Sequence, residues 1–302
     1  MEATDVAIIG AGPAGIAAAI QISRYNVRPA LFEQEEPGGL LRNAHLVENY
    51  PGFPTGISGP ELASLMKQQI EYHDLPVRHE RVLALDYEAG RFLIRATAGE
   101  LSCRFAVVAS GTVPKRIPGL AIPEDAADQV FYEVLAIREC ESRNIVVIGA
   151  GDAAFDYALG LAERNKVGLL SRSATVRCTP RLMERALSSR NISLRTGIEV
   201  AGVEVEKAAG RNGRLLLCCR QSGGPPMDKI AADYLLIAVG REPATHFLTG
   251  AVSGRSAQLI SAGELYMIGD VANGAIRQVS ISVGNGVEAA MRIAGYLGVR
   301  ND

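Results

Sequence analysis

The sequence predicts an α/β fold in which one parallel-sheet unit is inserted into another, and three observations support this prediction. A glycine-rich turn follows a buried strand near the N-terminus, a second copy of that strand and turn begins at Ile145, and the tail after Pro243 is too short to form a domain. A chain of 302 residues with 48% apolar composition is long enough for about two domains with proper cores.

The first glycine turn lies in residues 6–15, VAIIGAGPAG. Gly10 permits a tight turn, Gly12 lets the backbone approach a pyrophosphate, and Gly15 lets the next helix pack closely on the strand. That helix is expected near residues 16–25, and its N-terminus then faces the phosphates. The predicted binding residues of this turn are Gly10, Gly12, Pro13, Ala14 and Gly15.

A carboxylate completes this first nucleotide site. Glu33 ends the second apolar strand, residues 29–32, where an acid can accept hydrogen bonds from both ribose hydroxyls. Strand, glycines, helix, strand and acid follow one another in the order of a dinucleotide-binding fingerprint. The first unit is therefore predicted to bind an adenine dinucleotide.

The same pattern returns in residues 145–154, IVVIGAGDAA, with alanine in place of the third glycine. A helix near residues 153–164 and a second strand ending at Ser171 are expected to follow. Each copy continues into alternating apolar stretches, 81–109 and 199–238, which predict antiparallel meanders leading into a last strand. The predicted binding residues of the second turn are Gly149, Gly151, Asp152, Ala153 and Ala154.

The two last strands end alike, in the pattern Gly-x-x-Pro at Gly111 and again at Gly240. Glycine and proline interrupt regular structure, so these segments are the candidate crossings between domains. The first domain is predicted to comprise residues 1–113 and 244–302, and the inserted domain residues 114–243. Two covalent crossings predict possible rotation between the two halves.

The tail is expected to return to the first domain. It holds an apolar strand at residues 265–268, then Gly269 and Asp270, then a helix-forming run from about 278 to 297.

Composition restricts the class of partner. A net charge of −2 without long basic runs argues against nucleic acid and anionic membranes as partners, and no apolar run approaches membrane-spanning length. The acidic N-terminus leads directly into a core strand, so no signal peptide is expected. Five cysteines without metal-ligand spacing predict no metal site and fit a reducing compartment, so a cytoplasmic location is expected.

At this point the residues resemble the low-molecular-weight thioredoxin reductases and their relatives among the two-dinucleotide-fold flavoproteins. The most specific matches are residues 38–41, GGLL, residues 47–54, VENYPGFP, residues 269–271, GDV, and the pair Arg277 and Gln278. The resemblance implies FAD in the first domain, NADPH in the inserted domain, a homodimer, and hydride passed from nicotinamide to flavin. It adds these expected cofactor-binding residues: Gly39, Leu40, Asn49, Val82, Gly111, Gly240, Gly269, Asp270, Arg277, Gln278 and Val279.

Physical chemistry agrees with part of this assignment. Asp270 at a strand end can accept a hydrogen bond from a ribityl hydroxyl, and a helix starting near Gln278 can offer a backbone donor to the flavin's pyrimidine edge. Both interactions favour an anionic reduced flavin. Taken singly, Asp270 also fits a plain helix cap, and Asn49 a turn residue with a local side-chain bond.

The sequence departs from the resemblance at the redox-active cysteines. Thioredoxin reductases carry a Cys-x-x-Cys pair followed by an aspartate shortly before the second glycine turn, and those positions fall on Tyr132, Leu135 and Ala136 here. Electron transfer to a disulfide needs sulfur at that place. Cys140 and Cys178 have no partner at useful spacing, so no reduction of thioredoxin is expected. Tyr132 is the candidate residue for catalysis, with the hypothesis that its ring lies over the flavin and limits access.

The nucleotide of the second site depends on the position equivalent to Glu33, which is Ser171. A carboxylate there selects NADH, whereas Ser171 with Arg172, Ser173 and Arg177 offers two guanidinium groups and two hydroxyls to a 2'-phosphate. Thioredoxin reductases have His-Arg-Arg and a later arginine at these positions, so the two arginines match and the serines depart. NADPH is therefore predicted, although the run also fits a solvated helix face.

Three functions remain open. The first is an FAD-dependent NADPH oxidoreductase whose flavin reduces an unidentified acceptor directly, either a small molecule or a small redox protein. The second resembles the ferredoxin or flavodoxin NADP reductases, which also lack the cysteine pair but carry a C-terminal aromatic extension that this sequence does not match. The third is a non-catalytic flavin-binding protein.

Overall fold

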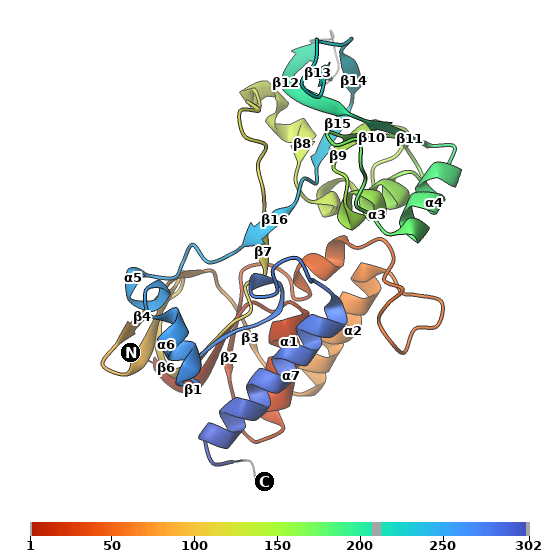
Figure 1. Cartoon of the computed structure of the whole chain (residues 1–302). Coiled ribbons are helices and arrows are strands. Elements are labelled where there is room, and N and C mark those ends of the chain that lie inside the picture. Colours follow the sequence, from red (N-terminus) through yellow and green to blue (C-terminus); the bar gives the residue numbers. More distant parts are fainter. Residues whose placement is uncertain (1, 207–212, 300–302) are drawn as a thin grey trace. The chain divides into compact units, whose positions relative to one another are not determined.

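The computed structural model describes residues 2–206 and 213–299 and divides the chain into two compact units (Figure 1). Unit 1 consists of Met1–Arg42, Val47–Val113 and Glu242–Asp302, and unit 2 consists of Asn43–Leu46 and Pro114–Arg241. The sequence placed residues 43–46 in the first domain and ended the inserted domain at residue 243. The structure differs on both points, and the contacts of residues 43–46 described below give the reason for the first difference.

The sheet of unit 1 has a parallel core in which the first strand is central. Its order is β3-β2-β1-β6, with β17 also paired to β6, and the strands are β1 (Glu2–Ile9), β2 (Ala30–Glu33), β3 (Val77–His79), β6 (Glu100–Val108) and β17 (Leu265–Met267). Residues 6–9 of β1 are all buried, as expected for a parallel strand covered on both faces.

The meander predicted for residues 81–109 is confirmed. Strand β4 (Val82–Glu88) pairs antiparallel with β5 (Arg91–Ala96), which pairs antiparallel with β6. Strand β6 thus ends the meander and also joins the parallel core, which places residues 109–111 beside the end of β1.

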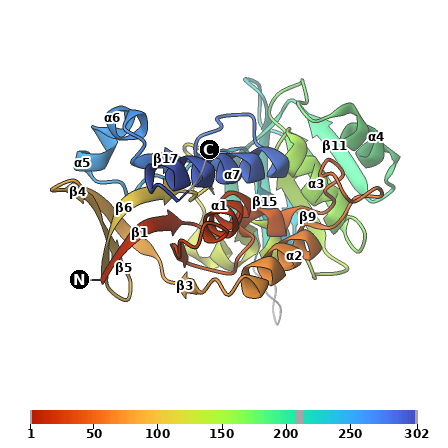
Figure 2. The ribbon, with the colours of Figure 1, turned by 90° about the horizontal axis from the view of Figure 1, so that it is seen from below.

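Two helices of unit 1 lie side by side, α1 (Pro13–Ser23) and α7 (Val279–Tyr296) (Figure 2). Small side chains allow their close approach: a Cβ added at Gly286 of α7 would overlap the carbonyl oxygen of Ala14 of α1. The sequence placed these helices within a few residues of their observed ends. Unit 1 also contains α2 (Gly59–Tyr72), α5 (Gly250–Ser253), α6 (Ser256–Ser261), η4 (Gly269–Val271) and all but the last residue of η1 (Gly39–Asn43).

Unit 2 repeats the arrangement of unit 1. Its parallel sheet has the order β11-β10-β9-β15-β8, so that the strand before the glycine turn is again central. The strands are β8 (Val130–Phe131), β9 (Asn144–Ile148), β10 (Lys166–Ser171), β11 (Ile192–Thr196) and β15 (Tyr234–Ile237), and the helical segments are η2 (Glu124–Gln129), η3 (Val134–Ile137), α3 (Asp152–Leu161) and α4 (Pro180–Ser188).

The second predicted meander, residues 199–238, includes residues 207–212, which lie outside the described residues. In its described part, β12 (Ile198–Glu206), β13 (Arg214–Gln221) and β14 (Ile230–Ala232) form an antiparallel sheet. Strands β7 (Thr112–Pro114) and β16 (Arg241–Pro243), at the two predicted crossings, pair with each other. Across the described ranges, the helices are all too short or too polar to cross a membrane.

Candidate nucleotide-binding sites

The three glycines of the first turn are required for different reasons. A Cβ at Gly15 would overlap the Gly10 carbonyl oxygen, and a Cβ at Gly10, where φ is +104°, would lie 2.5 Å from the Ala109 carbonyl oxygen. A Cβ at Gly12 would meet nothing within 4 Å. Packing therefore explains glycine at Gly10 and Gly15, whereas at Gly12 the open space lies where the fingerprint places a pyrophosphate.

The second turn has the same steric pattern. A Cβ at Gly149 would lie 2.5 Å from the Ala238 carbonyl oxygen and 2.6 Å from the Ala154 Cβ, while a Cβ at Gly151 would meet nothing within 4 Å. Helix α3 begins directly after Gly151, as α1 begins after Gly12. Both turns thus leave a cradle in front of a helix N-terminus, which fits an anionic group.

The Glu33 carboxylate is held against the first turn. Its Oε2 accepts a 2.8 Å hydrogen bond from the Ala11 amide and its Oε1 accepts a 3.0 Å bond from the Glu35 amide. Each carboxylate oxygen can accept a further hydrogen bond. The acid is therefore oriented at the end of β2, where the fingerprint places the ribose.

Segments far apart in the sequence meet at the start of α1. The Gly38 amide donates a 2.7 Å hydrogen bond to the Ala11 carbonyl oxygen, and a Cβ at Gly39 would lie 3.3 Å from the Gly12 Cα. On the other side, a Cβ at Gly269 would lie 2.8 Å from the Ala14 Cβ. The structure therefore brings together predicted FAD residues from residues 10–15, 38–40 and 269–270.

Asn285, which the sequence analysis missed, organises the turn that carries Asp270. Its Oδ1 on α7 accepts hydrogen bonds from the Gly269 amide at 3.3 Å and from the Asn273 side chain at 3.0 Å. Asp270 itself accepts a 3.4 Å hydrogen bond from the Ser282 hydroxyl of the same helix. Helix α7 also contains other polar residues, such as Ser282 and Glu288, so no sequence pattern singled out Asn285.

Two features mark the start of α7: a hydrogen bond between two side-chain amides and a buried donor without a partner among the described residues. The Asn49 side-chain amide donates a 2.7 Å hydrogen bond to Oε1 of Gln278, the residue before the helix. The Nε of Arg277 is buried and has no hydrogen-bond partner among the described residues. A buried donor without a partner is costly, which fits a site completed by a ligand.

Three predicted residues have mainly backbone roles in this structure. The Val82 side chain is buried in the core of unit 1, so it presents only its backbone to a ligand. Gly111 and Gly240 have φ of +65° and +117°, and their carbonyl oxygens accept from the amides of Ala244 and Lys115. Both glycines therefore shape the backbone of these two segments.

Leu40, another residue expected to bind the cofactor, is half-buried in η1.

The predicted phosphate loop after β10 has exposed arginines and one inward serine. Ser171 is 1% exposed and its hydroxyl donates a 2.7 Å hydrogen bond to the Ser173 carbonyl oxygen. The Ser173 hydroxyl accepts a 3.1 Å bond from the Thr175 amide, so its own proton can be donated to a ligand. Arg172 and Arg177 are exposed. Ser171 thus supports the loop, and the arginines and Ser173 carry the donors.

Tyr132 and Leu135 stand at the positions that the sequence analysis assigned to the two family cysteines, and Tyr132 is a packed aromatic residue. Tyr132 lies against an apolar cluster of unit 2, and its hydroxyl is bonded to Arg116 at 3.0 Å. Leu135, at the second cysteine position, is 37% exposed, and its amide donates to the Asn43 side chain. Neither site contains sulfur.

All five cysteines are free thiols, and each has a raised pKa. Burial raises the pKa of Cys103 to about 12 and also raises the pKa values of Cys140, Cys178 and Cys219. A hydrogen bond to Glu204 raises the pKa of Cys218. Protonated thiols are poor nucleophiles, so none of these residues has the character of a reactive cysteine.

Residues 43–46 group with unit 2 because buried polar groups hold them there. The Asp156 carboxylate accepts hydrogen bonds from the amides of His45, at 2.7 Å, and Leu46, at 3.3 Å. Arg138 donates a 2.8 Å bond to the carbonyl oxygen of Asn43, whose side chain is buried. Desolvation of Asp156 raises its pKa. No sequence pattern links residues so far apart, which is why the predicted boundary was wrong here.

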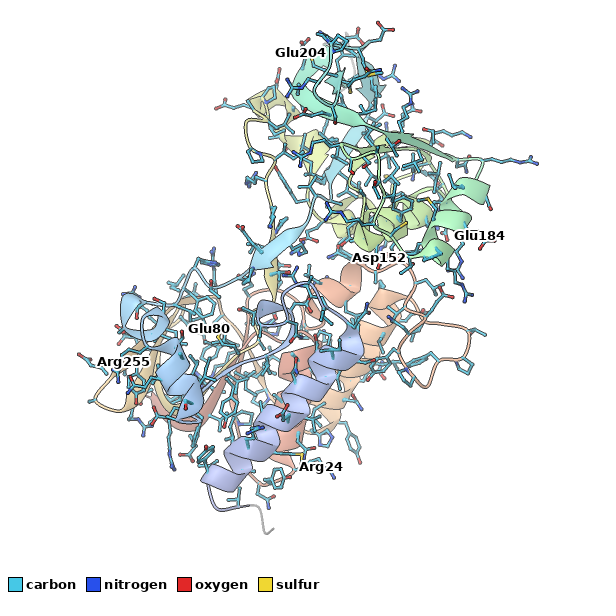
Figure 3. The ribbon with its side chains drawn as sticks, in the orientation of Figure 1. Arg24, Glu80, Asp152, Glu184, Glu204 and Arg255 are labelled. Carbon is cyan, nitrogen blue, oxygen red and sulfur yellow. The ribbon has the colours of Figure 1, made fainter. Side chains whose placement is uncertain are left out.

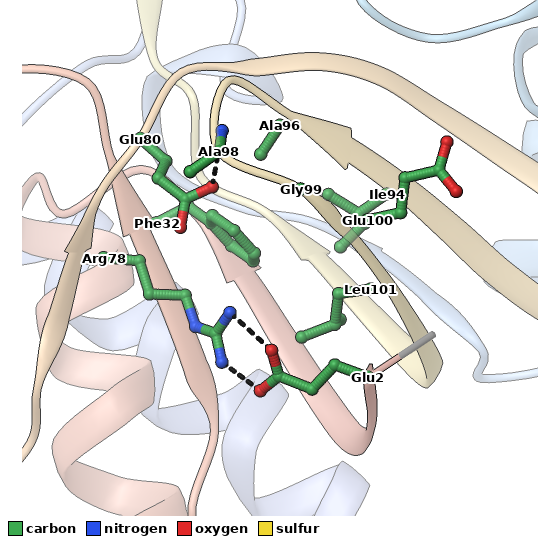
Figure 4. Close-up of a pocket in the computed structure, with 10 residues that line it drawn as sticks. All are labelled: Glu2, Phe32, Arg78, Glu80, Ile94, Ala96, Ala98, Gly99, Glu100 and Leu101. Carbon is green, nitrogen blue, oxygen red and sulfur yellow. Dashed lines mark hydrogen bonds and ion pairs between the residues drawn. The ribbon is translucent and has the colours of Figure 1, made fainter.

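Unit 1 also has a cavity of about 90 Å³ beside β2 and β3 (Figure 4). It is lined by the ion pair of Arg78 and Glu2 and by the turn between β5 and β6. None of the predicted site residues lines it, and it is too small for a dinucleotide. Across the described ranges, His, Cys, Asp and Glu side chains form no cluster that fits a metal ion.

Two glycine turns of one steric pattern, each before a helix in its own parallel sheet, define a protein with two dinucleotide-binding domains. Residues 4–286 match the family described as pyridine nucleotide-disulphide oxidoreductase, and the chain belongs to this family of flavin-dependent oxidoreductases.

Within this family the chain is similar to thioredoxin reductases. It is 31% identical over 317 residues to thioredoxin reductase from Streptomyces coelicolor, covering 100% of this chain and 96% of that protein. It is 28% identical over 320 residues to NADPH-dependent thioredoxin reductase 3 from Arabidopsis thaliana, covering 98% of this chain but only 59% of that protein. The crystal structure of Lactococcus lactis thioredoxin reductase matches with a TM-score of 0.85 and 25% identity, covering 98% of this chain and 99% of that one.

Thioredoxin reductases use FAD and NADPH, and the two glycine turns fit those two dinucleotides. The orphaned Arg277 Nε and the open space at Gly12 support a ligand in unit 1, and the exposed arginines after β10 support a phosphorylated ribose in unit 2.

Proposed function

We propose that the chain is an FAD-dependent NADPH oxidoreductase that passes hydride from NADPH to FAD and then electrons directly to an acceptor, without a protein dithiol. The bound flavin supplies the two-electron chemistry. This chain's residues hold the dinucleotides: the first turn with Glu33 holds FAD in unit 1, and the second turn with Arg172 and Arg177 holds NADPH in unit 2.

One observation carries this proposal: in each turn the space at the second glycine, Gly12 or Gly151, is open, whereas the space at the first glycine, Gly10 or Gly149, is closed by packing. A turn whose glycines serve only the fold needs no open middle position. The non-catalytic alternative explains the turn of unit 1 but gives no reason for the matching turn and exposed arginines of unit 2.

The departure from thioredoxin reductase chemistry rests on Tyr132 and Leu135. Disulfide reduction requires a thiolate beside the flavin, and these positions hold a phenol and an aliphatic side chain. The remaining thiols have raised pKa values and are poorly suited to replace the missing pair. The acceptor is therefore inferred to be a small molecule or a small redox protein that takes electrons from the flavin itself.

The first experiment tests both cofactors. The purified protein is expected to be yellow with one FAD per chain, and NADPH is expected to bleach the flavin without air. NADH should bleach it more slowly, and Arg172→Ala should remove most of the difference because NADH lacks the 2'-phosphate that a guanidinium pairs with. A colourless, folded protein that cannot take up FAD would contradict the assignment, and a flavin that NADPH leaves oxidised would support the non-catalytic alternative.

The second experiment tests the acceptor. Steady-state oxidation of NADPH is measured with disulfides, quinones, oxygen, flavodoxin and ferredoxin, and thioredoxin is expected to remain oxidised. A preference for ferredoxin or flavodoxin would favour the NADP reductase-like alternative. Robust reduction of thioredoxin, abolished by Cys140→Ser or Cys178→Ser, would overturn the proposal.

The resemblance also leads us to infer a homodimer, which sedimentation of the holoprotein tests directly. The five free cysteines support a reducing, cytoplasmic setting. A net charge of −2 supports neither nucleic acid nor a membrane as partner.

A further inference from the structure

We infer that Asp152 is a positioning residue that holds the end of the phosphate loop, residues 171–179, and thereby sets the preference for a nucleotide with a 2'-phosphate. The sequence analysis assigned Asp152 to nucleotide binding as part of the second glycine turn. In the structure its carboxylate instead accepts a hydrogen bond from the backbone of Thr179. This inference rests on the proposed use of NADPH and specifies which residue shapes that site.

Asp152 joins the glycine turn to the far end of the loop. It is the first residue of α3 and is labelled in Figure 3. Its Oδ1 accepts a 2.7 Å hydrogen bond from the amide of Thr179, the residue before α4. A hydrogen bond to a charged acceptor is stronger than one between neutral groups. Asp152 therefore ties the start of α3 to the start of α4.

Two backbone amides, those of Arg177 and Thr179, tie the end of the loop to the second glycine turn. The Arg177 amide donates a 2.7 Å hydrogen bond to the carbonyl oxygen of Ala150, and Thr179 is tied to Asp152 two residues later. The Arg177 side chain is exposed, so its backbone anchors decide where the guanidinium starts. Loss of the Asp152 bond releases one of these two anchors.

Electrostatics argue against Asp152 as a direct ligand of the nucleotide. A carboxylate facing a pyrophosphate is repelled by it, whereas a carboxylate at the N-terminus of a helix is stabilised. The bond to Thr179 turns the carboxylate toward the N-terminus of the nine-residue helix α4. Asp152 also contributes to the raised pKa of Cys178, after desolvation, which agrees with its place beside the loop.

The test measures binding of two fragments, 2',5'-ADP and 5'-AMP, to the FAD-loaded protein by calorimetry. The wild type should bind 2',5'-ADP more tightly. Asp152→Ala should lower the ratio of the two affinities by about tenfold, equivalent to about 1.4 kcal/mol. Asp152→Asn should keep most of the ratio, because the amide oxygen still accepts from Thr179. Glu184→Ala removes an exposed carboxylate from α4 without touching this bond, and should leave the ratio unchanged.

Thr179→Pro provides a second route to the same question. The φ of Thr179 is −62°, which proline adopts, so this variant deletes the donor and retains the Asp152 charge. It should lower the ratio as Asp152→Ala does. Folding of each variant is checked by its circular dichroism and flavin content.

Three outcomes overturn the inference. Equal weakening of both fragments in Asp152→Ala and Asp152→Asn would make Asp152 a direct ligand, and an unchanged ratio in Asp152→Ala would leave it a plain helix residue. A ratio lowered equally by Glu184→Ala would assign the effect to general charge. If the wild type itself does not prefer 2',5'-ADP, the proposed use of NADPH fails. If the wild type prefers 2',5'-ADP and the Asp152 variants keep the same ratio, only the role of Asp152 fails.

Discussion

The Arg116 guanidinium lies over the Tyr132 ring, 4.7 Å from its centroid, and its Nη1 donates a 3.0 Å hydrogen bond to the Tyr132 hydroxyl oxygen. The ring is thereby held at the position that the resemblance to thioredoxin reductases assigns to the first cysteine of their redox pair. A cation over an aromatic face is favourable even at an exposed site. Tyr132 therefore has a packing and hydrogen-bonding role of its own in unit 2.

Substitution of Tyr132 separates packing from hydrogen bonding. Tyr132→Phe keeps the stacked ring and should cost at most about 1 kcal/mol in the free energy of unfolding, whereas Tyr132→Ala, which also loses the half-buried ring, should cost about 2 kcal/mol. Urea denaturation measures both. If the ring limits access to the flavin, Tyr132→Ala should also speed oxidation of the reduced protein by a small quinone relative to Tyr132→Phe. Equal rates in the two variants would reject that hypothesis.

The glycines predict opposite phenotypes at neighbouring positions. Gly12→Ala should fold and lose FAD, because its Cβ enters only the space assigned to the pyrophosphate. Gly15→Ala should disturb folding, because its Cβ overlaps the Gly10 carbonyl oxygen. Thermal unfolding and bound flavin are measured for both. A Gly12→Ala protein that keeps its flavin would remove the main argument for the site. In unit 2, the single variants Gly151→Ala and Gly149→Ala repeat the comparison.

Glu33→Ala should weaken retention of FAD. Loss of charged hydrogen bonds to the ribose costs about 1.5 to 3 kcal/mol, which corresponds to an increase in Kd of about ten- to a hundredfold. Titration of the flavin-free protein with FAD, followed by flavin fluorescence, measures this change. Glu35→Ala is the matched control because it removes an exposed neighbouring carboxylate. Similar losses in both variants would show that general charge, and not the ribose contact, is responsible.

Asp156 predicts a pH dependence of the stability of unit 2. Desolvation raises its folded pKa above the usual 3.8, so its contribution is fully present below that value and is lost as the pH rises through the raised pKa. The difference in free energy of unfolding between the wild type and Asp156→Asn should therefore fall as the pH rises from the usual 3.8 through the raised folded pKa. Denaturant titrations across this pH range measure the difference. The same comparison, with and without Asp156→Asn, in a His45→Gln background removes the contribution of the neighbouring imidazole. A difference that is constant with pH would contradict the assignment.

Local patterns sufficed to predict most of the fold. The strand, glycine turn and helix around Gly10 and again around Gly149 depend on neighbouring residues, and the meanders follow from alternation. Helix α2 was missed, although Ser58 and Glu61 form a capping box with a proline between them, which is a readable start signal.

The rest required contacts between distant residues. The grouping of residues 43–46 with unit 2 depends on Asp156, and the roles of Ser171 and Asp152 depend on which backbone groups their side chains meet. The sequence showed these residues near a nucleotide turn but not the direction of their side chains. The steric difference between Gly12 and its two neighbours likewise follows only from the positions of other backbone atoms.

The pairing of α1 with α7 fixes an order of assembly during synthesis. The chain is made from its N-terminus, so α1 emerges early and must wait for a helix near the other end of the described residues before its apolar face is covered. The strands of unit 2 are all complete before β17 and α7 have been translated. A growing polypeptide can therefore complete the strands of unit 2 while the ribosome is still at work, whereas unit 1 closes only after α7 has been made. The FAD proposed for unit 1 is then expected to bind after that point.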